Sequence, residues 1–194
     1  MQRRMFPKSA MVLIVAIFGL LIMSCFSFAA EFSADYYQKM AGVTITGKIY
    51  VKGDKIRQEM IREGQKGVMI VRMDKEVIWH LMPEERMYME MTFGKEHSAV
   101  FDKELEKIAT KKYLGKEKVH GWVCDKYEII YHDKSMGTAT QWFSKRLNFP
   151  IKMEFSSPYG QGITEYKNIR EKRLSDSLFE IPLGYKKMDM PMMP

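Results

Sequence analysis

The sequence predicts a mainly β domain of the α+β class, built as a strongly curved antiparallel sheet of about ten strands with two helices. Three observations predict this fold. Apolar and polar residues alternate with a period of two along most of the chain after residue 43. The alternating runs are short and are separated by turn residues at spacings near ten residues. Within residues 30–187 only two stretches depart from this pattern, and 194 residues are enough for one domain with a buried core.

The first departure, residues 33–41, predicts a short N-terminal helix. Ser33 is a good N-cap residue, Asp35 falls in the first turn, and Gly42 is placed to end the helix. After Gly42 the period changes to two.

Five strands of an antiparallel meander follow. In the first, Ile45, Ile49 and Val51 share one face with Gly47, and polar residues occupy the other face. Short turns rich in Gly, Asp, Lys and Glu separate the runs. The predicted strands are 44–51, 55–62, 67–73, 76–82 and 86–91.

The second departure, residues 96–109, predicts an amphipathic helix because Phe101, Leu105 and Ile108 recur at helical spacing. Strands then resume, and a segment over 179–182 is expected to dock at the end of the domain. The later predicted strands are 111–114, 117–119, 122–131, 136–143, 150–155 and 162–169.

A sheet of this size cannot leave one apolar face in water, so it must curl, pair with a second sheet or be covered by helices. A curved sheet with the 96–109 helix across its opening meets this demand and tends to leave an apolar cavity between the two. We therefore predict a ligand cavity with this helix as its lid. Its predicted lining is Ile70, Trp79, Leu81, Met87, Met89, Met91, Phe101 and Leu105.

Residues 1–29 are typical of a secretory signal peptide. Residues 11–23 form an uncharged apolar run, and Ser27 and Ala29 provide small side chains before a cleavage point. The alternative is an uncleaved membrane anchor, which needs about 20 apolar residues and would have to include three Ser or Cys positions. The basic residues that precede the apolar run are Arg3, Arg4 and Lys8.

Residues 22–25 also form an imperfect lipobox, which would make Cys25 an acylated first residue of the mature chain. Cleavage near Ala29 is favoured over lipidation of Cys25, because Met23 fits the lipobox poorly and Phe26 and Phe28 continue the apolar run beyond it. In either scheme Cys124 is left without a disulfide partner, so burial must stabilise the domain. We predict that Cys124 is a small buried hydrophobic residue.

The net charge of +7 falls when the leader is removed. Residues 1–29 hold three cations and no acids, which leaves 28 Lys and Arg against 24 Asp and Glu. These charges are interspersed, without a basic block, so nucleic-acid binding is not expected. A transient contact with anionic lipid head groups is compatible with this charge.

The chain shows no G-x-S-x-G, H-E-x-x-H or C-x-x-C motif and no phosphate-binding glycine loop. Its four histidines are scattered. The sequence therefore predicts a protein that is not an enzyme and needs no cofactor.

Methionine is over-represented, with 18 residues. Met87, Met89 and Met91 alternate along one predicted strand and so point the same way. They could fill a core, form a deformable wall for an acyl chain, or bind copper(I) with His80 or His97. The C-terminal methionines of residues 188–194 offer a further copper ligand set in a tail that is expected to be frayed.

Several segments resemble a family of uncharacterised bacterial envelope proteins related to the LolA/LolB-like lipoprotein carriers. They are residues 47–57, 77–91 and 179–186. The resemblance implies an unclosed β-barrel over residues 30–187, with helices as a lid over an apolar cavity that holds acyl chains. It also implies a monomeric carrier for a lipid or an acylated protein in the periplasm of a Gram-negative bacterium, tethered to a membrane if Cys25 is lipidated.

Two alternatives to the carrier function stay open at this point. One is a Met-dependent copper(I)-binding protein. The other is a regulatory or structural envelope module that binds a protein partner through an exposed strand edge.

Overall fold

A computed structural model describes residues 30–92 and 107–188 of the chain, and these residues form one sheet of 12 strands. The order across the sheet is β12-β6-β5-β4-β3-β2-β1-β11-β10-β9-β8-β7. All neighbouring strands are antiparallel except β12, which runs parallel to β6. The strands are β1 (Glu31–Met40), β2 (Val43–Lys52), β3 (Lys55–Arg62), β4 (Gln65–Arg72), β5 (Val77–Met82), β6 (Met87–Thr92), β7 (Ala109–Val119), β8 (Trp122–Tyr131), β9 (Thr138–Ser144), β10 (Phe149–Ser157), β11 (Gly160–Glu171) and β12 (Lys186–Lys187).

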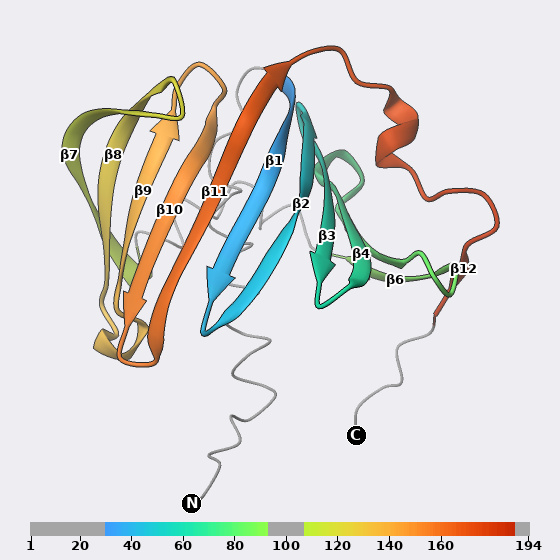
Figure 1. The fold of residues 1–194 in the computed structure, drawn as a ribbon, viewed down its shortest axis with the longest axis horizontal. Coiled ribbons are helices and arrows are strands. Elements are labelled where there is room, and N and C mark those ends of the chain that lie inside the picture. Colours follow the sequence, from blue (N-terminus) through green and yellow to red (C-terminus); the bar gives the residue numbers. More distant parts are fainter. Residues whose placement is uncertain (1–29, 93–106, 189–194) are drawn as a thin grey trace, which may run out of the picture.

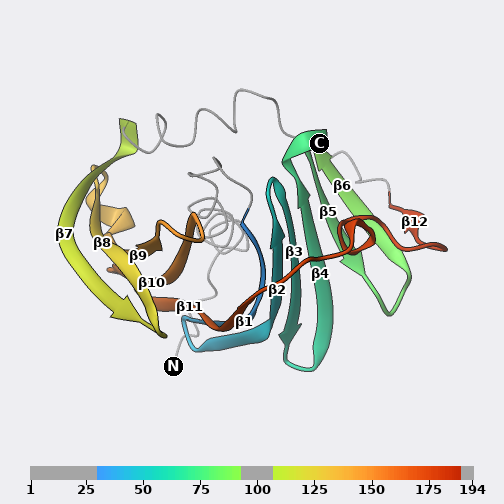
Figure 2. The ribbon, with the colours of Figure 1, turned by 90° about the horizontal axis from the view of Figure 1, so that it is seen from above.

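The sheet consists of two meanders joined at its centre, where β1 pairs with β11. Seen from above, the sheet bends into two wings, β1–β6 and β7–β11, that curve around a common interior (Figure 2). The edge strands β7 and β12 do not pair with each other, so the sheet stays open. The predicted mainly β, curved, unclosed antiparallel sheet is therefore confirmed.

Gly47 in β2 permits a close approach between this strand and β3. A Cβ atom at this position would lie 1.8 Å from the Glu59 carbonyl oxygen of β3, closer than any side chain permits. The absence of a side chain lets the two backbones approach at a bend, which is a common use of glycine inside a strand.

The predicted N-terminal helix over 33–41 is wrong, because these residues belong to β1, the central strand (Figure 1). Phe32, Ala34 and Tyr36 alternate on the buried face, and β1 is hydrogen-bonded to a neighbour on both sides. Gly42 does not cap a helix. With Ala41 it forms a hairpin turn in which both residues have positive φ, 48° and 83°, as a type I′ turn requires.

Most of the predicted lid helix over 96–109, including Phe101 and Leu105, lies outside the described residues. Lys107 and Ile108 have helical backbone, but Ala109 already belongs to β7. In the described ranges the 3-10 segments are η2 (Met73–Lys75), η3 (Lys134–Met136) and η4 (Asp176–Phe179), of which the longest has four residues.

The two strands predicted at 111–114 and 117–119 are a single strand, β7. Its register against β8 shifts between Tyr113 and Gly115, so Leu114 is an extra residue at a β-bulge. The bulge breaks the alternation along the strand, and that is why the sequence pattern divided it in two.

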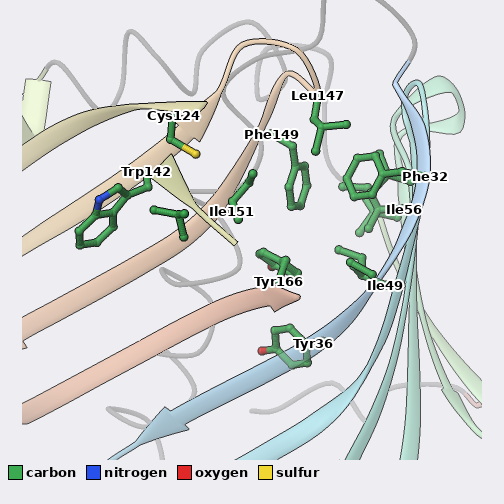
Figure 3. Close-up of a cluster of buried hydrophobic side chains, with 14 residues drawn as sticks. Phe32, Tyr36, Ile49, Ile56, Cys124, Trp142, Leu147, Phe149, Ile151 and Tyr166 are labelled. Atoms are coloured by element: carbon green, nitrogen blue, oxygen red, sulfur yellow. The ribbon is translucent and has the colours of Figure 1, made fainter. Parts of the chain in front are cut away.

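The inner face of the sheet carries the main core. Phe32, Ile49 and Ile56 from one wing meet Phe149 and Tyr166 from the other inside the bend (Figure 3). The ring centroids of Phe149 lie 5.3 Å from Phe32 and 5.0 Å from Tyr166, in edge-to-face arrangements that favour aromatic contact. This cluster holds the two wings together across the interior.

The outer face of β3–β6 is covered by residues 174–188, which we call the C-terminal strap. Phe179 of the strap is fully buried against Ile70, Trp79 and Leu81. The strap runs over the outside of the green wing in Figure 1 and ends in β12, where the Lys186 amide donates to Arg86 O at 2.9 Å. A terminal docking segment at 179–182 was predicted, and the structure places it here.

Candidate functional site

The predicted cavity residues do not lie on one face of the sheet. Some lie on its inner face, and others lie on the outer face under the C-terminal strap. Across β4 and β5, Ile70 lies directly opposite Trp79, and their side chains point to the outer face with Leu81. All three are less than 7% exposed because the C-terminal strap packs on them. The outer face is therefore occupied by the chain itself.

Met87, Met89 and Met91 lie on the inner face of β6. Met89 is opposite His80, and Met91 is opposite Ile78, which packs against the main core. The structure thus brings the three methionines together but separates them from the predicted residues of β4 and β5. The remaining predicted positions, Phe101, Leu105 and Cys25, lie outside the described residues.

The inner face also holds polar side chains that the sequence analysis missed. Gln58, Gln141 and Thr164 are at most 5% exposed. Gln141 and Thr164 each lie opposite Met153, so they occupy inward positions of neighbouring strands. The only signal in the sequence was a polar residue at an apolar position of the alternation.

Three buried polar atoms of the inner face have no hydrogen-bond partner among residues 30–92 and 107–188. They are the Tyr131 hydroxyl, the Gln141 Oε1 atom and the Tyr166 hydroxyl. The buried Trp142 indole nitrogen does not belong to this set of atoms without a partner, because it lies beside the Glu117 carboxylate and lowers the pKa of that group. A buried polar atom without a partner is costly, about 1–3 kcal/mol, and such atoms are rare in folded proteins.

The two tyrosine hydroxyls of this set are hydrogen-bond donors at neutral pH. Burial raises the pKa of Tyr131 to about 12 and the pKa of Tyr166 well above its ordinary value. Both hydroxyls therefore keep their protons and can donate to a bound molecule.

Open space lies over the inner face beside Gly67 of β4. Among the described residues, no heavy atom beyond its chain neighbours lies within 4 Å of where a Cβ atom would stand. Gly67 is opposite Met60 of β3. Within the described part of the chain, the methionine-bearing wing therefore has room for at least a methyl-sized group at this position of its inner face.

A separate recess of roughly 220 Å³ lies on the outer face of β2, β1 and β11. The small residues Ser33 and Ala34 of β1 contribute to its lining. The Asp35 carboxylate accepts a 2.7 Å hydrogen bond from the Asn168 amide. The recess is also lined by Lys48, Arg170 and Lys172, and none of these three side chains has an ion-pair partner within the described part of the chain.

The edge strand β7 carries the features by which sheets avoid pairing with other chains. It has a bulge at Leu114, and most of its side chains are exposed. Charged residues and bulges on an edge oppose the addition of another strand. Its lysines are Lys111, Lys112, Lys116 and Lys118.

Neither a clustered set of the common metal ligands nor an activated cysteine is found among the described residues. Within residues 30–92 and 107–188 there is no cluster of three or more His, Cys, Asp or Glu side chains. Burial raises the pKa of the Cys124 thiol to about 11, which is opposite to what a nucleophilic cysteine needs. In the same ranges, no helix is both long and apolar enough to cross a membrane.

A protein-family model described as a domain of unknown function, DUF4412, matches residues 37–148. The chain belongs to this family. The match spans β2–β9 with the end of β1, and thus includes strands of both wings of the sheet. The prediction of an uncharacterised family is confirmed. A search of curated proteins finds no match for this DUF4412 member.

Solved structures resemble this DUF4412 protein in fold. An uncharacterised conserved protein from Thermus thermophilus has a TM-score of 0.61 at 10% identity, over 93% of this chain and 99% of that one. MucB of Pseudomonas aeruginosa, in its complex with MucA, has a TM-score of 0.55 at 12% identity, over 76% of this chain and 54% of MucB. At these identities the likeness shows the fold alone.

The LolA superfamily, which the sequence resembles, is also among the matches. A LolA superfamily protein from Nitrosomonas europaea aligns over 80% of this chain and 92% of its own, with 11% identity and a TM-score of 0.33. A TM-score this low carries no argument about structural detail.

Proposed function

We propose that this protein is a non-enzymatic binding or carrier protein of the bacterial periplasm, and that it holds a lipid or the acyl group of a lipidated protein on the inner face of its sheet. The observation that carries the proposal is the combination, on that face, of buried apolar side chains with three polar atoms that lack partners in the described ranges of the chain. An acyl chain would contact the apolar side chains. The ester or amide at its head would accept hydrogen bonds from hydroxyl groups such as that of Tyr131.

The methionines of β6 suit this role because thioether side chains are flexible and adapt to irregular ligands. Met87, Met89 and Met91 remain in the proposed lining, together with the open space beside Gly67. The outer-face residues Ile70, Trp79 and Leu81 are left out of it, because the strap already covers them.

The proposed location in the periplasm rests on residues 1–29, whose basic start, apolar run and small-residue exit are typical of a signal peptide. The fold shared with MucB, which was crystallised with MucA, supports a binding role for this architecture. The chain also lacks the common catalytic motifs.

Contact with a membrane surface is part of the proposal. Lys48, Arg170 and Lys172 present three cations on one outer surface, and each cation near an anionic membrane contributes about 1 kcal/mol to binding. We expect the variant with all three replaced by Gln to bind phosphatidylglycerol vesicles at least tenfold more weakly at low salt. Equal binding by the variant would remove this surface from the proposal.

Lipid extraction and mass spectrometry of the purified protein test the binding function, followed by titration with a fluorescent fatty acid. The informative variant is Gly67→Trp, which places a large side chain on the inner face at a position where a Cβ atom meets no other described residue. The matched control is Lys66→Trp, one position earlier on β4, where the exposed side chain points away from the interior.

We expect Gly67→Trp to lose most fatty-acid uptake and Lys66→Trp to keep it, with both proteins folded by circular dichroism. The proposal fails if the wild-type protein carries no lipid and takes up no fatty acid. Equal uptake by the two variants would place any bound lipid away from the inner face.

A further inference from the structure

His80 of β5 stands between two methionines on the inner face. The register places Met69 of β4 directly opposite His80 on one side and Met89 of β6 directly opposite it on the other. Side chains that are directly opposite in antiparallel strands share a face, with Cβ atoms about 4.5–5.5 Å apart. The imidazole therefore has a thioether neighbour on each side.

More methionines surround Met69, His80 and Met89, the three residues that we call the row. Met82 lies two residues beyond His80 and pairs with Met87, and Met91 lies two residues beyond Met89. Met60 faces inward from β3 and packs against the main core. Thioethers are thus available on both sides of the row and along the strands.

The imidazole of His80 is partly buried and has no hydrogen-bond partner among the described residues. A neutral imidazole is a common metal ligand and offers one unprotonated ring nitrogen. Because the ring is only partly buried, a small ion can reach it, and no described side chain competes for its nitrogens. The register of the three strands is therefore what points to a ligand at this place.

The ligand set has no carboxylate. On β6 the carboxylate residue is Glu90, and it points to the outer face, where it accepts a 2.9 Å hydrogen bond from the Trp79 indole nitrogen. Hard cations such as Mg²⁺ and Ca²⁺ prefer oxygen ligands, whereas thioether sulfur with imidazole suits copper(I). We propose that Met69, His80 and Met89 form a three-coordinate site for one copper(I) ion on the inner face.

Packing alone would explain methionines on an apolar face, so the test must distinguish the loss of a sulfur ligand from a change in side-chain packing. Leucine has nearly the volume of methionine, and such a replacement usually costs less than about 1.5 kcal/mol. Met69→Leu and Met89→Leu therefore keep the packing and remove one ligand atom each. Met40→Leu, on the inner face of β1 in the centre of the sheet, is the matched control.

The C-terminal methionines need a control of their own, because they could bind copper(I) independently of the sheet. A variant with Leu at all three of the last methionines removes them and leaves the row intact. The replaced positions are Met190, Met192 and Met193.

The experiment uses the chain in the form that a Gram-negative host produces, and titrates it anaerobically with copper(I) in ascorbate against the chelator bathocuproine disulfonate. We expect one copper(I) per chain, at least tenfold weaker binding for Met69→Leu and for Met89→Leu, and unchanged binding for Met40→Leu and for the tail variant. X-ray absorption of the wild-type complex should show two sulfur ligands and one nitrogen ligand.

The proposal is overturned if the two row variants keep wild-type affinity, if the tail variant loses the site, or if absorption shows oxygen ligands. Zinc(II) binding as tight as that of copper(I) would also overturn it. Lipid uptake is measured separately with the fluorescent fatty acid, so either proposal can fail without the other.

Discussion

Truncation of Phe179 to Ala tests whether the C-terminal strap stabilises the fold. The Phe179 side chain is fully buried between the strap and the outer face of β4 and β5. Loss of a fully buried phenyl ring, together with the cavity that it leaves, costs about 3–5 kcal/mol. Folded domains are stable by only about 5–15 kcal/mol, so the Phe179→Ala variant should lose a large part of its stability.

Urea unfolding followed by tryptophan fluorescence measures this loss, because Trp79 lies in the same cluster and reports on it. Leu183→Ala is the control within the strap, since that side chain is fully exposed and its loss should change the free energy of unfolding by less than about 0.5 kcal/mol. A loss below about 1 kcal/mol for Phe179→Ala would refute the reasoning, because it would show that the strap is not packed as described.

Three further predictions concern titration and buried polar groups. The Arg72 guanidinium lowers the pKa of Asp74, so this carboxylate stabilises the fold above its ordinary pKa and stops doing so as pH falls through its lowered value. The urea concentration at the unfolding midpoint should therefore decrease when the pH is lowered below about 4, and it should decrease less in Asp74→Asn. Because burial raises the pKa of Cys124 to about 11, its thiol should react with a disulfide reagent at pH 8 only at the rate of unfolding, and reaction at the rate of a free thiol would contradict this. Tyr131→Phe should raise the free energy of unfolding by about 1 kcal/mol, because it removes a buried hydroxyl that has no partner in residues 30–92 and 107–188. It should also weaken lipid binding in the fluorescence titration, and a destabilised variant would show that the hydroxyl has a partner after all.

Most strands could be predicted from the alternation of apolar and polar residues, because each strand has one face in a core. The structure of the segment over 33–41 could not be predicted in this way, because its sequence fits both a helix and a strand. Ser33 and Gly42 suit the ends of a helix, while Phe32, Ala34 and Tyr36 alternate as in a strand. Hydrogen bonding to β2 on one side and to β11 on the other stabilises the strand conformation. Since β11 lies more than a hundred residues away in sequence, local sequence does not reveal this pairing. Tertiary pairing of this kind overrides local helix signals.

The division of residues between the two faces of β4–β6 could not be predicted from alternation. Trp79 and Leu81 alternate with Ile78 and His80, and both sets contain apolar residues. The reason is physical: one face of this wing packs on the strap and the other faces the interior, so neither is fully exposed to water. A strand covered on both faces loses the contrast that identifies its inner side. The sequence therefore grouped residues that the sheet separates.

The same comparison of faces indicates where a ligand can bind. On the outer face of β4–β6, under the strap, Trp79 donates to Glu90, and Arg72 pairs with Asp74 and Glu180 and donates to Phe179 O at 3.1 Å. On the inner face, the hydroxyls of Tyr131 and Tyr166 and the Gln141 oxygen are buried and have no partner among the described residues. Since a folded chain rarely leaves several buried polar groups unpaired, their gathering on one face favours that face as the one that receives a ligand.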